Sequence, residues 1–281
     1  MRTLIGGLQI YDTSYKSAKF LAGLKKFELA NSGIQIIGNN EMVELGWKNL
    51  TTIITTYFDV YGAAKLLKLN MPKWKTFKCL GDSCSISVSI GYDYYSKLCF
   101  LTNELKLILT NKNLQDFWTG GTVCAPKKSN KRQCTKPTVG CEELIGDLKI
   151  GAKFDVKKVK ALRVLYGSLI VNETNFTNLD FLESLTHIFQ IDMDKPAIDV
   201  QKNKKLKTAR FPKLKQIWNN SGWNRILFKD NSEHLLIDVQ SCFALRSMLT
   251  PVGKYKEPEF EYQNCEWIKE NAENQTKKKT G

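Results

Sequence analysis

The 281-residue sequence contains no run of about 18 consecutive apolar residues, and this absence predicts that no segment of the chain crosses a membrane. The first residues, MRTLIGGLQI, lack the pattern of a signal peptide, because the apolar stretch is short and no small-residue cleavage site follows it. No C-x-x-C pair is present, and the only histidines are His187 and His234. The spacings of zinc fingers and zinc ribbons are therefore missing.

The residue sets that carry enzyme chemistry are missing as well. His187 ends an amphipathic stretch and His234 lies in a polar segment, so both are interpreted as surface or packing residues. The glycines of TGGT, residues 119–122, are not followed by the Lys-Ser/Thr of a phosphate-binding loop. Without a nucleophile, a base or a metal-ligand set, the sequence predicts a protein that is not an enzyme and uses no cofactor or metal.

Cysteine, by contrast, is well represented. Eight cysteines without metal-binding spacing favour disulfides, and disulfides favour an oxidising compartment. Five Asn-x-Ser/Thr sequons agree with secretion and predict N-glycosylation, although chance is the alternative because these residues are common here. Together the two features predict an extracellular protein. The sequons begin at Asn49, Asn172, Asn175, Asn219 and Asn274.

Basic residues are in excess. The formal net charge is +14, carried partly by lysine-rich runs at 127–132, 202–207 and 277–279. Such runs can bind nucleic acid, acidic glycans or acidic lipids. They lack interleaved aromatic residues and contain more lysine than arginine, which is the usual reader of bases. Solvated loops are the favoured interpretation and no nucleic acid partner is predicted, while acidic glycans stay open as an alternative.

One heptapeptide pattern, Leu-x-Gly-x-Leu-x-Ile/Val, occurs three times, at 4–10, 144–150 and 165–171. Shifting the chain by 161 residues places 4–24 on 165–185 without a gap and with seven identities, where composition alone would give roughly one. The chain is therefore predicted to contain two copies of one domain. In this alignment 4–10 matches the later heptapeptide of the second copy. The first domain is thus expected to be N-terminally truncated, without its opening turn.

The heptapeptides also indicate the type of fold. Their apolar residues alternate, which is typical of strands with one buried face, and short amphipathic segments such as 17–27 and 178–188 separate them. Short strands about 20 to 40 residues apart predict a β-solenoid with leucine-rich-repeat character and short helices. An α/β sheet with crossover helices is the competing interpretation, but the connecting segments are too short for it.

The strings CEELIGDLKI (141–150) and LYGSLIVNETNFTNLDFLESLTHI (165–188), a later Ile-x-Val turn and a cysteine near the last strand resemble the receptor L domain of insulin and EGF receptor ectodomains. The pairing of two such domains resembles the nematode insulin/EGF-receptor-like L-domain proteins. The resemblance covers 141–265 completely and 1–124 partially. It implies a right-handed parallel β-helix and an extracellular, non-catalytic binding module. Unlike the receptors, this chain has no cysteine-rich module between the domains and no kinase motif.

On this basis the predicted organisation has four parts. These are an incomplete receptor L-like domain at 1–126, a basic linker at 127–140, a second receptor L-like domain at 141–267 and a polar tail at 268–281.

The duplication also predicts disulfides. Cys99 and Cys242 follow the last strand of each copy, and Cys124 and Cys265 lie at a similar distance downstream, so the expected pairs are Cys99–Cys124 and Cys242–Cys265. The other four cysteines are assigned locally as Cys79–Cys84 and Cys134–Cys141, with the remaining connectivities of eight cysteines left open.

A candidate ligand face follows from the alternation. If Leu4, Leu8 and their counterparts point inward, the intervening residues point outward and line up in a strip across one sheet. Apolar residues placed where polar ones are expected are common at interfaces. Cover by loops or by sugar on Asn172 is the alternative. The candidate residues are Ile145, Lys149, Tyr166 and Ile170, with Ile5 and Gln9 in the first copy.

The leading functional prediction is a secreted protein, or the ectodomain of a membrane protein whose anchor and signal peptide are missing from this chain, that binds a protein or peptide ligand. The alternative is a structural or adhesion protein that binds acidic glycans through basic patches. A more distant alternative is a decayed gene product without binding activity.

Overall fold

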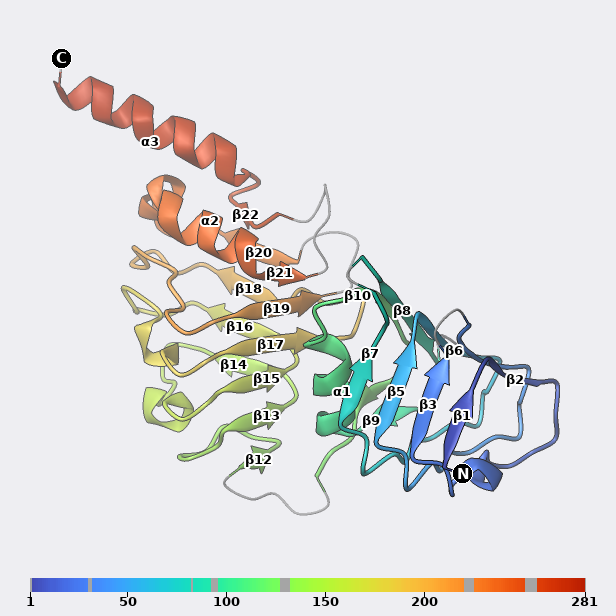
Figure 1. Ribbon diagram of the computed structural model, residues 1–281. Coiled ribbons are helices and arrows are strands. Elements are labelled where there is room, and N and C mark those ends of the chain that lie inside the picture. Colours follow the sequence, from blue (N-terminus) through green and yellow to red (C-terminus); the bar gives the residue numbers. More distant parts are fainter. Residues whose placement is uncertain are drawn as a thin grey trace. The chain divides into compact units, whose positions relative to one another are not determined.

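The computed structural model describes residues 2–29, 32–81, 83–91, 96–126, 132–219, 225–250 and 257–280. The chain divides into two compact units, Met1–Cys124 (unit 1) and Ala125–Gly281 (unit 2). Each unit is a parallel β-solenoid in which the short strands of successive turns stack into sheets (Figure 1). This confirms the predicted β-solenoid with short helices.

Unit 1 contains two main sheets, in which all described strand pairs are parallel. Sheet 1A has the order β1-β3-β5-β7 and sheet 1B the order β10-β8-β6-β4-β2, while β9 and β11 form a small separate pair. The elements are β1 (Thr3–Ile5), β2 (Leu8–Tyr11), η1 (Lys19–Leu21), β3 (Lys26–Leu29), β4 (Ile34–Ile37), β5 (Thr52–Thr55), β6 (Tyr57–Tyr61), β7 (Thr76–Lys78), β8 (Ile86–Ile90), β9 (Cys99–Phe100), α1 (Thr102–Leu109), β10 (Leu114–Trp118) and β11 (Thr122–Val123).

Unit 2 repeats this plan. Sheet 2A has the order β12-β13-β15-β17-β19-β21 and sheet 2B the order β14-β16-β18-β20-β22. The elements are β12 (Gln133–Cys134), β13 (Glu143–Ile145), β14 (Leu148–Ile150), η2 (Val156–Val159), β15 (Val164–Tyr166), β16 (Leu169–Asn172), η3 (Asp180–Leu182), β17 (His187–Gln190), β18 (Ile198–Gln201), β19 (Gln216–Asn219), β20 (Ile226–Lys229), η4 (Glu233–Ile237), α2 (Val239–Met248), β21 (Leu249–Thr250), β22 (Glu259–Phe260) and α3 (Cys265–Thr280).

The core of each solenoid consists of rows of apolar side chains that stack from turn to turn. In sheet 1B, Leu8, Ile34 and Phe58 are register partners on successive strands, and all are buried. In sheet 2B, Leu148, Leu169 and Ile198 occupy the corresponding row. Fully burying one such side chain contributes roughly 1.5–3 kcal/mol. Because no single turn encloses its own row, the turns are stable only when stacked.

Each heptapeptide forms two strands, not the single strand predicted from its alternation. At 4–10 the chain leaves β1, turns at a glycine and enters β2 on the next sheet. The three pattern glycines have positive φ values, +106° at Gly6, +115° at Gly146 and +151° at Gly167, which other residues rarely adopt. Glycine therefore occurs here because the corner between two sheets requires it.

Strand order and hydrogen bonding relate the first heptapeptide to different turns of unit 2. Counted from the first strand of each five-stranded sheet in the described residues, β2 takes the place of β14. The bonds of Thr13 to Asn39 and of Thr174 to Asn203 instead match β2 to β16, as in the sequence alignment. The missing opening turn stays a prediction.

One buried asparagine in each unit closes the corner after a strand: Asn39 follows β4 and Asn203 follows β18. Asn39 Oδ1 accepts from the backbone N and Oγ1 of Thr13, and its Nδ2 donates to the carbonyls of Ile10 and Ile37. In unit 2, Asn203 makes the equivalent bonds to Thr174, Val171 and Gln201. Such side chains satisfy backbone groups that a tight corner leaves without sheet partners.

Two stretches outside the predicted domains have regular structure. Residues 133–134, assigned to the basic linker, form β12 and pair in parallel with β13. Most of the predicted polar tail belongs to α3, whose first turn buries Cys265 and Ile268. The linker's run at 127–131 lies outside the described residues.

Candidate functional site

The outward surface of sheet 1B, called here the 1B face, is the most distinctive described surface of unit 1. Its strands alternate, with inner side chains such as Leu8, Ile36 and Val60 buried and the intervening ones directed away from the core. The outward residues are Gln9, Tyr11, Gln35, Ile37, Tyr57, Asp59, Tyr61, Ser87, Ser89, Gln115, Asp116 and Trp118.

Strand register arranges these side chains in rows across the sheet. One row, in which each residue is the register partner of the next, is Gln9, Gln35, Asp59, Ser89 and Trp118. A second row, next to it, is Tyr11, Ile37 and Tyr61. Register partners on neighbouring strands lie about 4.8 Å apart, so the rows form a continuous surface.

Aromatic side chains stand out from this face. Tyr11 is 43% exposed, Tyr61 51% and Trp118 39%, although rings of this size are usually more deeply buried in a folded domain. The five strands contain no lysine or arginine, in a chain with 42 of them. Enriched Tyr and Trp with depleted Lys is the composition of a protein interface.

Hydrogen bonds and close packing hold parts of the face in place. Tyr11 Oη donates to Gln35 Oε1 at 2.5 Å, and Gln9 Nε2 donates to the same oxygen at 3.1 Å. The ring of Tyr57 lies over Gly33, where an added Cβ would be 2.1 Å from ring carbons. Side chains ordered before binding lose less conformational entropy when a ligand arrives.

The acidic groups give the face its charge. Burial raises the pKa of the Asp59 carboxyl above its ordinary value, and a hydrogen bond from Ser89 opposes this effect in part. Asp116 is the other charged outward residue in these strands, and it is half-buried. The face is therefore acidic in a strongly basic chain.

The equivalent surface of unit 2, the 2B face, has different chemistry. By strand register, its main row is Lys149, Ile170, Asp199, Leu227 and Glu259. The neighbouring row contains Asn172, Gln201 and Lys229. Asn172 is exposed and begins a glycosylation sequon, so a sugar attached there would cover part of this sheet.

The four predicted ligand-face residues do not form one strip. Lys149 is exposed and its register partner Ile170 is half-buried on the 2B face. Ile145 and Tyr166 are register partners on sheet 2A and are buried, Tyr166 to 3% exposure. The prediction of outward exposure was wrong for these two, because the glycine corner places them on a different sheet from Lys149 and Ile170.

Four of the five sequon asparagines are exposed, namely Asn49, Asn172, Asn175 and Asn274. Asn219 is the exception. Its side chain is 0% exposed in β19, and its Nδ2 donates to the backbone carbonyl of Lys195 at 3.0 Å. A glycan on that nitrogen is incompatible with this structure, because the attachment atom lies inside the folded unit.

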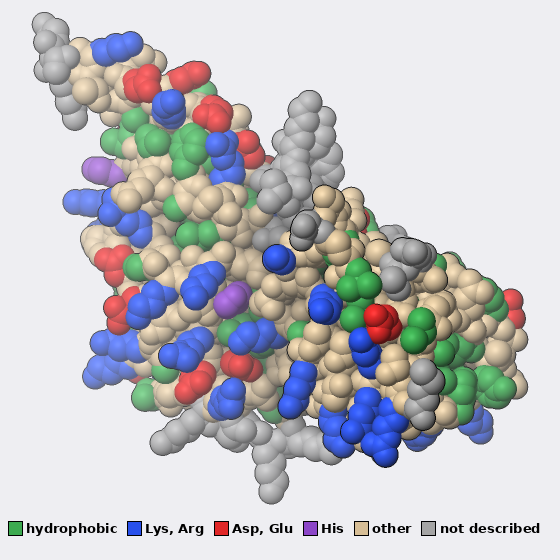
Figure 2. Space-filling view, in the orientation of Figure 1, with side chains coloured by type: hydrophobic (Ala, Val, Ile, Leu, Met, Phe, Trp, Pro, Cys, Tyr) green, Lys and Arg blue, Asp and Glu red, His purple; other side chains and the backbone are tan. Residues whose placement is uncertain are grey.

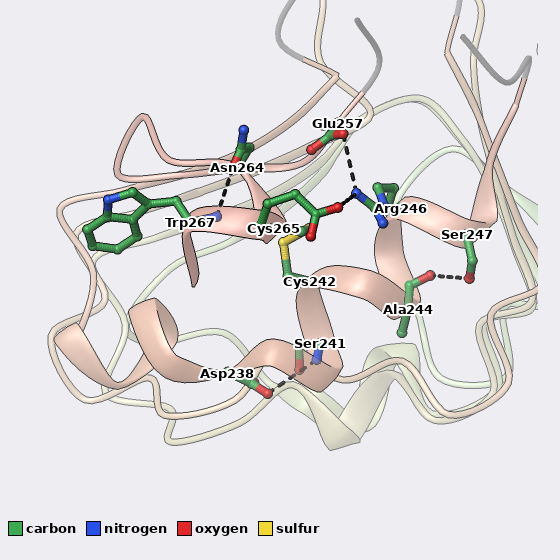
Figure 3. The surroundings of a disulfide bond; sticks show 11 residues. Asp238, Ser241, Cys242, Ala244, Arg246, Ser247, Glu257, Asn264, Cys265 and Trp267 are labelled. Carbon is green, nitrogen blue, oxygen red and sulfur yellow. Dashed lines mark hydrogen bonds and ion pairs between the residues drawn. A yellow bond between two sulfur atoms is a disulfide. The ribbon is translucent and has the colours of Figure 1, made fainter. Parts of the chain in front are cut away.

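The structure contains disulfides between the four cysteine pairs expected from the sequence, Cys79–Cys84, Cys99–Cys124, Cys134–Cys141 and Cys242–Cys265. The last one joins α2 to the first residue of α3 (Figure 3). Beside it, Arg246 forms ion pairs with Glu257 at 3.3 Å and Glu266 at 2.8 Å. This end of the solenoid is thereby closed, since a terminal turn needs a cap.

Family comparison identifies part of the chain. Residues 140–245 match the model of the receptor L domain family. These residues are therefore similar to receptor L domains. The matched residues lie within unit 2. Unit 1 has a corresponding order of strands, so both units share the solenoid architecture. No curated protein and no solved structure matches the chain at a significant level.

Receptor L domains are non-catalytic modules that bind protein ligands. In the described parts of the chain, no group of three or more His, Cys, Asp or Glu side chains is arranged to hold a metal ion. Within the same residues, no helix has the length and hydropathy needed to cross a membrane.

The 1B face was missed as a candidate by sequence reasoning, apart from Gln9. A signal was nevertheless present, because LQIY, YFDVY and LQDFW contain aromatic residues and none of the five strand segments, IQII and ISVSI included, contains a lysine. The segments could be joined into one surface only when the strand order was known.

Proposed function

We propose that this chain is an extracellular, receptor-like protein that binds a protein ligand through the 1B face. The receptor L domain supports the general class of ligand-binding module. The observation that carries the proposal is the exposed, lysine-free set of aromatic side chains, above all Tyr11, Tyr61 and Trp118. The disulfides and the exposed sequons support an extracellular location.

Charge narrows the kind of ligand. Asp59 and Asp116 face outward, and no cation on the same strands neutralises them. A ligand segment that combines basic and apolar side chains would complement this surface, because opposite charges favour encounter and like charges exclude wrong partners. A strongly acidic segment would gain no ion pair with this face. It would also have to lose the water bound to its own carboxylates, which opposes binding more than repulsion by the face does.

The 2B face supports binding less well. Lys149 and Lys229 project from it, Leu227 is buried, and the sequon at Asn172 lies in its second row. Lysine is depleted at interface centres, and an attached sugar would exclude a flat protein partner. For these reasons the proposal places the ligand on unit 1.

Selection of phage-displayed random peptides on the full chain tests the proposal. Peptides tend to occupy the surfaces that protein ligands use, since both exploit the same hot spots. The variant Tyr61→Ala/Trp118→Ala should weaken the selected peptides about 30-fold, equivalent to about 2 kcal/mol for loss of aromatic anchors. Dissociation constants are measured by biolayer interferometry.

The matched control is Gln201→Ala/Glu259→Ala, which alters the equivalent positions of the 2B face. It should leave peptide affinity within about twofold, which corresponds to less than about 0.5 kcal/mol. Peptides that bind both variants and the unaltered chain equally would show that the 1B face is not the binding surface. Thermal melts of both variants check that neither substitution disturbs folding.

A further inference from the structure

A basic edge lies where the strands of sheet 1A begin. Arg2, Lys25 and Lys75 occupy one column there, separated by Thr51. Backbone hydrogen bonds link the column: Lys25 N donates to Arg2 O at 2.8 Å, Thr51 N to Lys25 O at 2.9 Å and Lys75 N to Thr51 O at 2.9 Å. The three cationic side chains are all exposed. Stacking of turns thus brings together cations that are far apart in the sequence.

Two further exposed lysines extend this edge. Lys48 and Lys73 precede β5 and β7, and Lys73 Nζ donates to Asn49 Oδ1 at 3.0 Å. None of the five cations forms an ion pair with a carboxylate among the described residues. Figure 2 shows Lys and Arg side chains gathered along the lower edge of unit 1, where the strands of sheet 1A start in Figure 1.

A row of hydroxyl groups adjoins the cations. Thr3, Lys26, Thr52 and Thr76 are register partners on the outer side of sheet 1A, and each is half-buried. Lys26 is neutralised by Glu28 at 2.6 Å, so this row contributes mainly hydroxyl donors. Charged nitrogens beside hydroxyls suit anionic groups such as sulfate or carboxylate.

The solenoid itself does not require this charge. In unit 2 the equivalent column, linked by the same backbone bonds, contains Glu142, Arg163, Thr186 and Lys215. There an acidic residue takes the place of Arg2, and the exposed cations are fewer. Like charges placed together destabilise a protein modestly unless a partner of opposite sign binds.

We propose that the basic edge of unit 1, formed by Arg2, Lys25, Lys48, Lys73 and Lys75, binds a linear polysaccharide that carries sulfate or carboxylate groups. Three strand steps separate Arg2 from Lys75, a span of about 14 Å, which exceeds any single small anion. The repeating anions of such a polymer match repeating cations on a sheet. This site is distinct from the 1B face and from the lysine run at 202–207.

The test uses the full chain with its own sequons, because Asn49 begins a sequon on this edge. Asn49→Gln is measured beside it, and binding by this variant alone would overturn the proposal. Affinity for a heparin oligosaccharide is measured by isothermal titration calorimetry at moderate salt. Lys25→Glu/Lys75→Glu should weaken binding about tenfold, since two ion pairs are replaced by repulsion. Lys25→Arg/Lys75→Arg should keep the affinity within about twofold.

The matched control is Lys204→Glu/Lys205→Glu, which makes the same charge change in the run at 202–207 on exposed residues. This control should weaken heparin binding by less than about twofold. An equal loss in both variants would overturn the proposal, because net charge alone would explain binding. Equal affinity of the unaltered chain for single-stranded DNA of matched charge would overturn it also. If the reversal lowers thermal stability, Lys25→Gln/Lys75→Gln replaces it and must still lose binding.

Discussion

The 1B and 2B faces are built on the same strand arrangement and carry different chemistry, acidic and aromatic on the first and of mixed charge on the second. Each covers five parallel strands in the described residues, and their inner rows are equally apolar. Counted from the first strand of each sheet, their outer rows differ at nearly every position: Gln9 lies where Lys149 does, Gln35 where Ile170 does and Trp118 where Glu259 does. Inner positions are constrained by stacking, whereas outer positions are free to diverge, so the function of each unit depends on its outer rows.

The two faces differ in shape as well as in charge. In unit 1 the ring of Tyr57 lies on Gly33, while the equivalent positions of unit 2 are Ala197 and Ser168. Ser168 donates to the carbonyl of Pro196 instead of supporting an aromatic ring. Gly33 leaves room for this ring, because a Cβ at that position would lie 2.1 Å from its carbons.

The largest expected effect concerns the corners beside the two faces. Asn203→Ala removes partners from Thr174, Val171 and Gln201, and also breaks its bond to Asn231. We expect the free energy of unfolding to fall by about 3 kcal/mol, because several buried polar groups lose their hydrogen bonds. Denaturant unfolding followed by circular dichroism measures this.

Asn39→Ala is the matched substitution in unit 1. It should lower the free energy of unfolding by a smaller amount than Asn203→Ala does. Thr13 is half-buried and Asn39 bonds no second asparagine among the described residues, so water can replace part of the lost network. A larger loss for Asn39→Ala than for Asn203→Ala would contradict the idea that the linked asparagines of unit 2 form the stronger corner.

A smaller effect on stability is expected from the close contact between Tyr57 and Gly33, which distinguishes the 1B face from the 2B face. Gly33→Ala places a Cβ 2.1 Å from the Tyr57 ring, so the ring must move and the 1B face loses its ordered surface. We expect about 1–2 kcal/mol of destabilisation and weaker peptide binding. Tyr57→Ala in the same chain should restore most of the stability, as seen in a double-mutant cycle of unfolding free energies.

Gly7→Ala is the control one strand away. Its added Cβ would meet Ser32 Cβ at 3.3 Å, a contact that a slight shift relieves. A cost for Gly7→Ala as large as that for Gly33→Ala would show that loss of glycine, and not the ring, causes the effect.

The smallest effect concerns pH. Because the pKa of Asp59 is raised in the folded protein, this group favours folding below its unfolded pKa, and that contribution is lost as pH rises through the folded pKa. Asp59→Asn should therefore raise the neutral-pH free energy of unfolding by less than about 1 kcal/mol, since solvent screens a half-exposed carboxyl. Unfolding curves at several pH values measure this.

Peptide binding gives the companion measurement. Cationic peptides should lose affinity as pH falls through the raised pKa of Asp59, and Asp59→Asn should flatten that dependence. Asp199→Asn, at the equivalent position of the 2B face, should leave it unchanged. The same flattening in both variants would place the peptide outside the 1B face.

Much of the fold was predictable because it depends on local patterns. Alternating leucines and short spacers indicated strands and a solenoid, and the order of Cys99, Cys124, Cys242 and Cys265 along the duplicated chain indicated disulfides. The corner in the heptapeptide was not predictable in the same way. Alternation around Gly146 continues through the corner, and only the positive φ shows that Ile145 and Lys149 leave on different sheets.

The candidate site was less predictable. Tyr61 and Trp118 are 57 residues apart in sequence, and nothing local indicates that β6, β8 and β10 lie side by side. The exposed sequon at Asn172 and the buried one at Asn219 have the same local motif, so burial separated them.

The sequence by itself determined the solenoid, the resemblance to receptor L domains and the excess of positive charge, because these follow from spacing and composition. Only the tertiary structure decided which residues share a face. In a stacked solenoid, neighbours across strands come from different turns, and a one-residue change in register or corner moves a side chain to another surface. The aromatic 1B face and the basic edge of unit 1 are both products of that stacking.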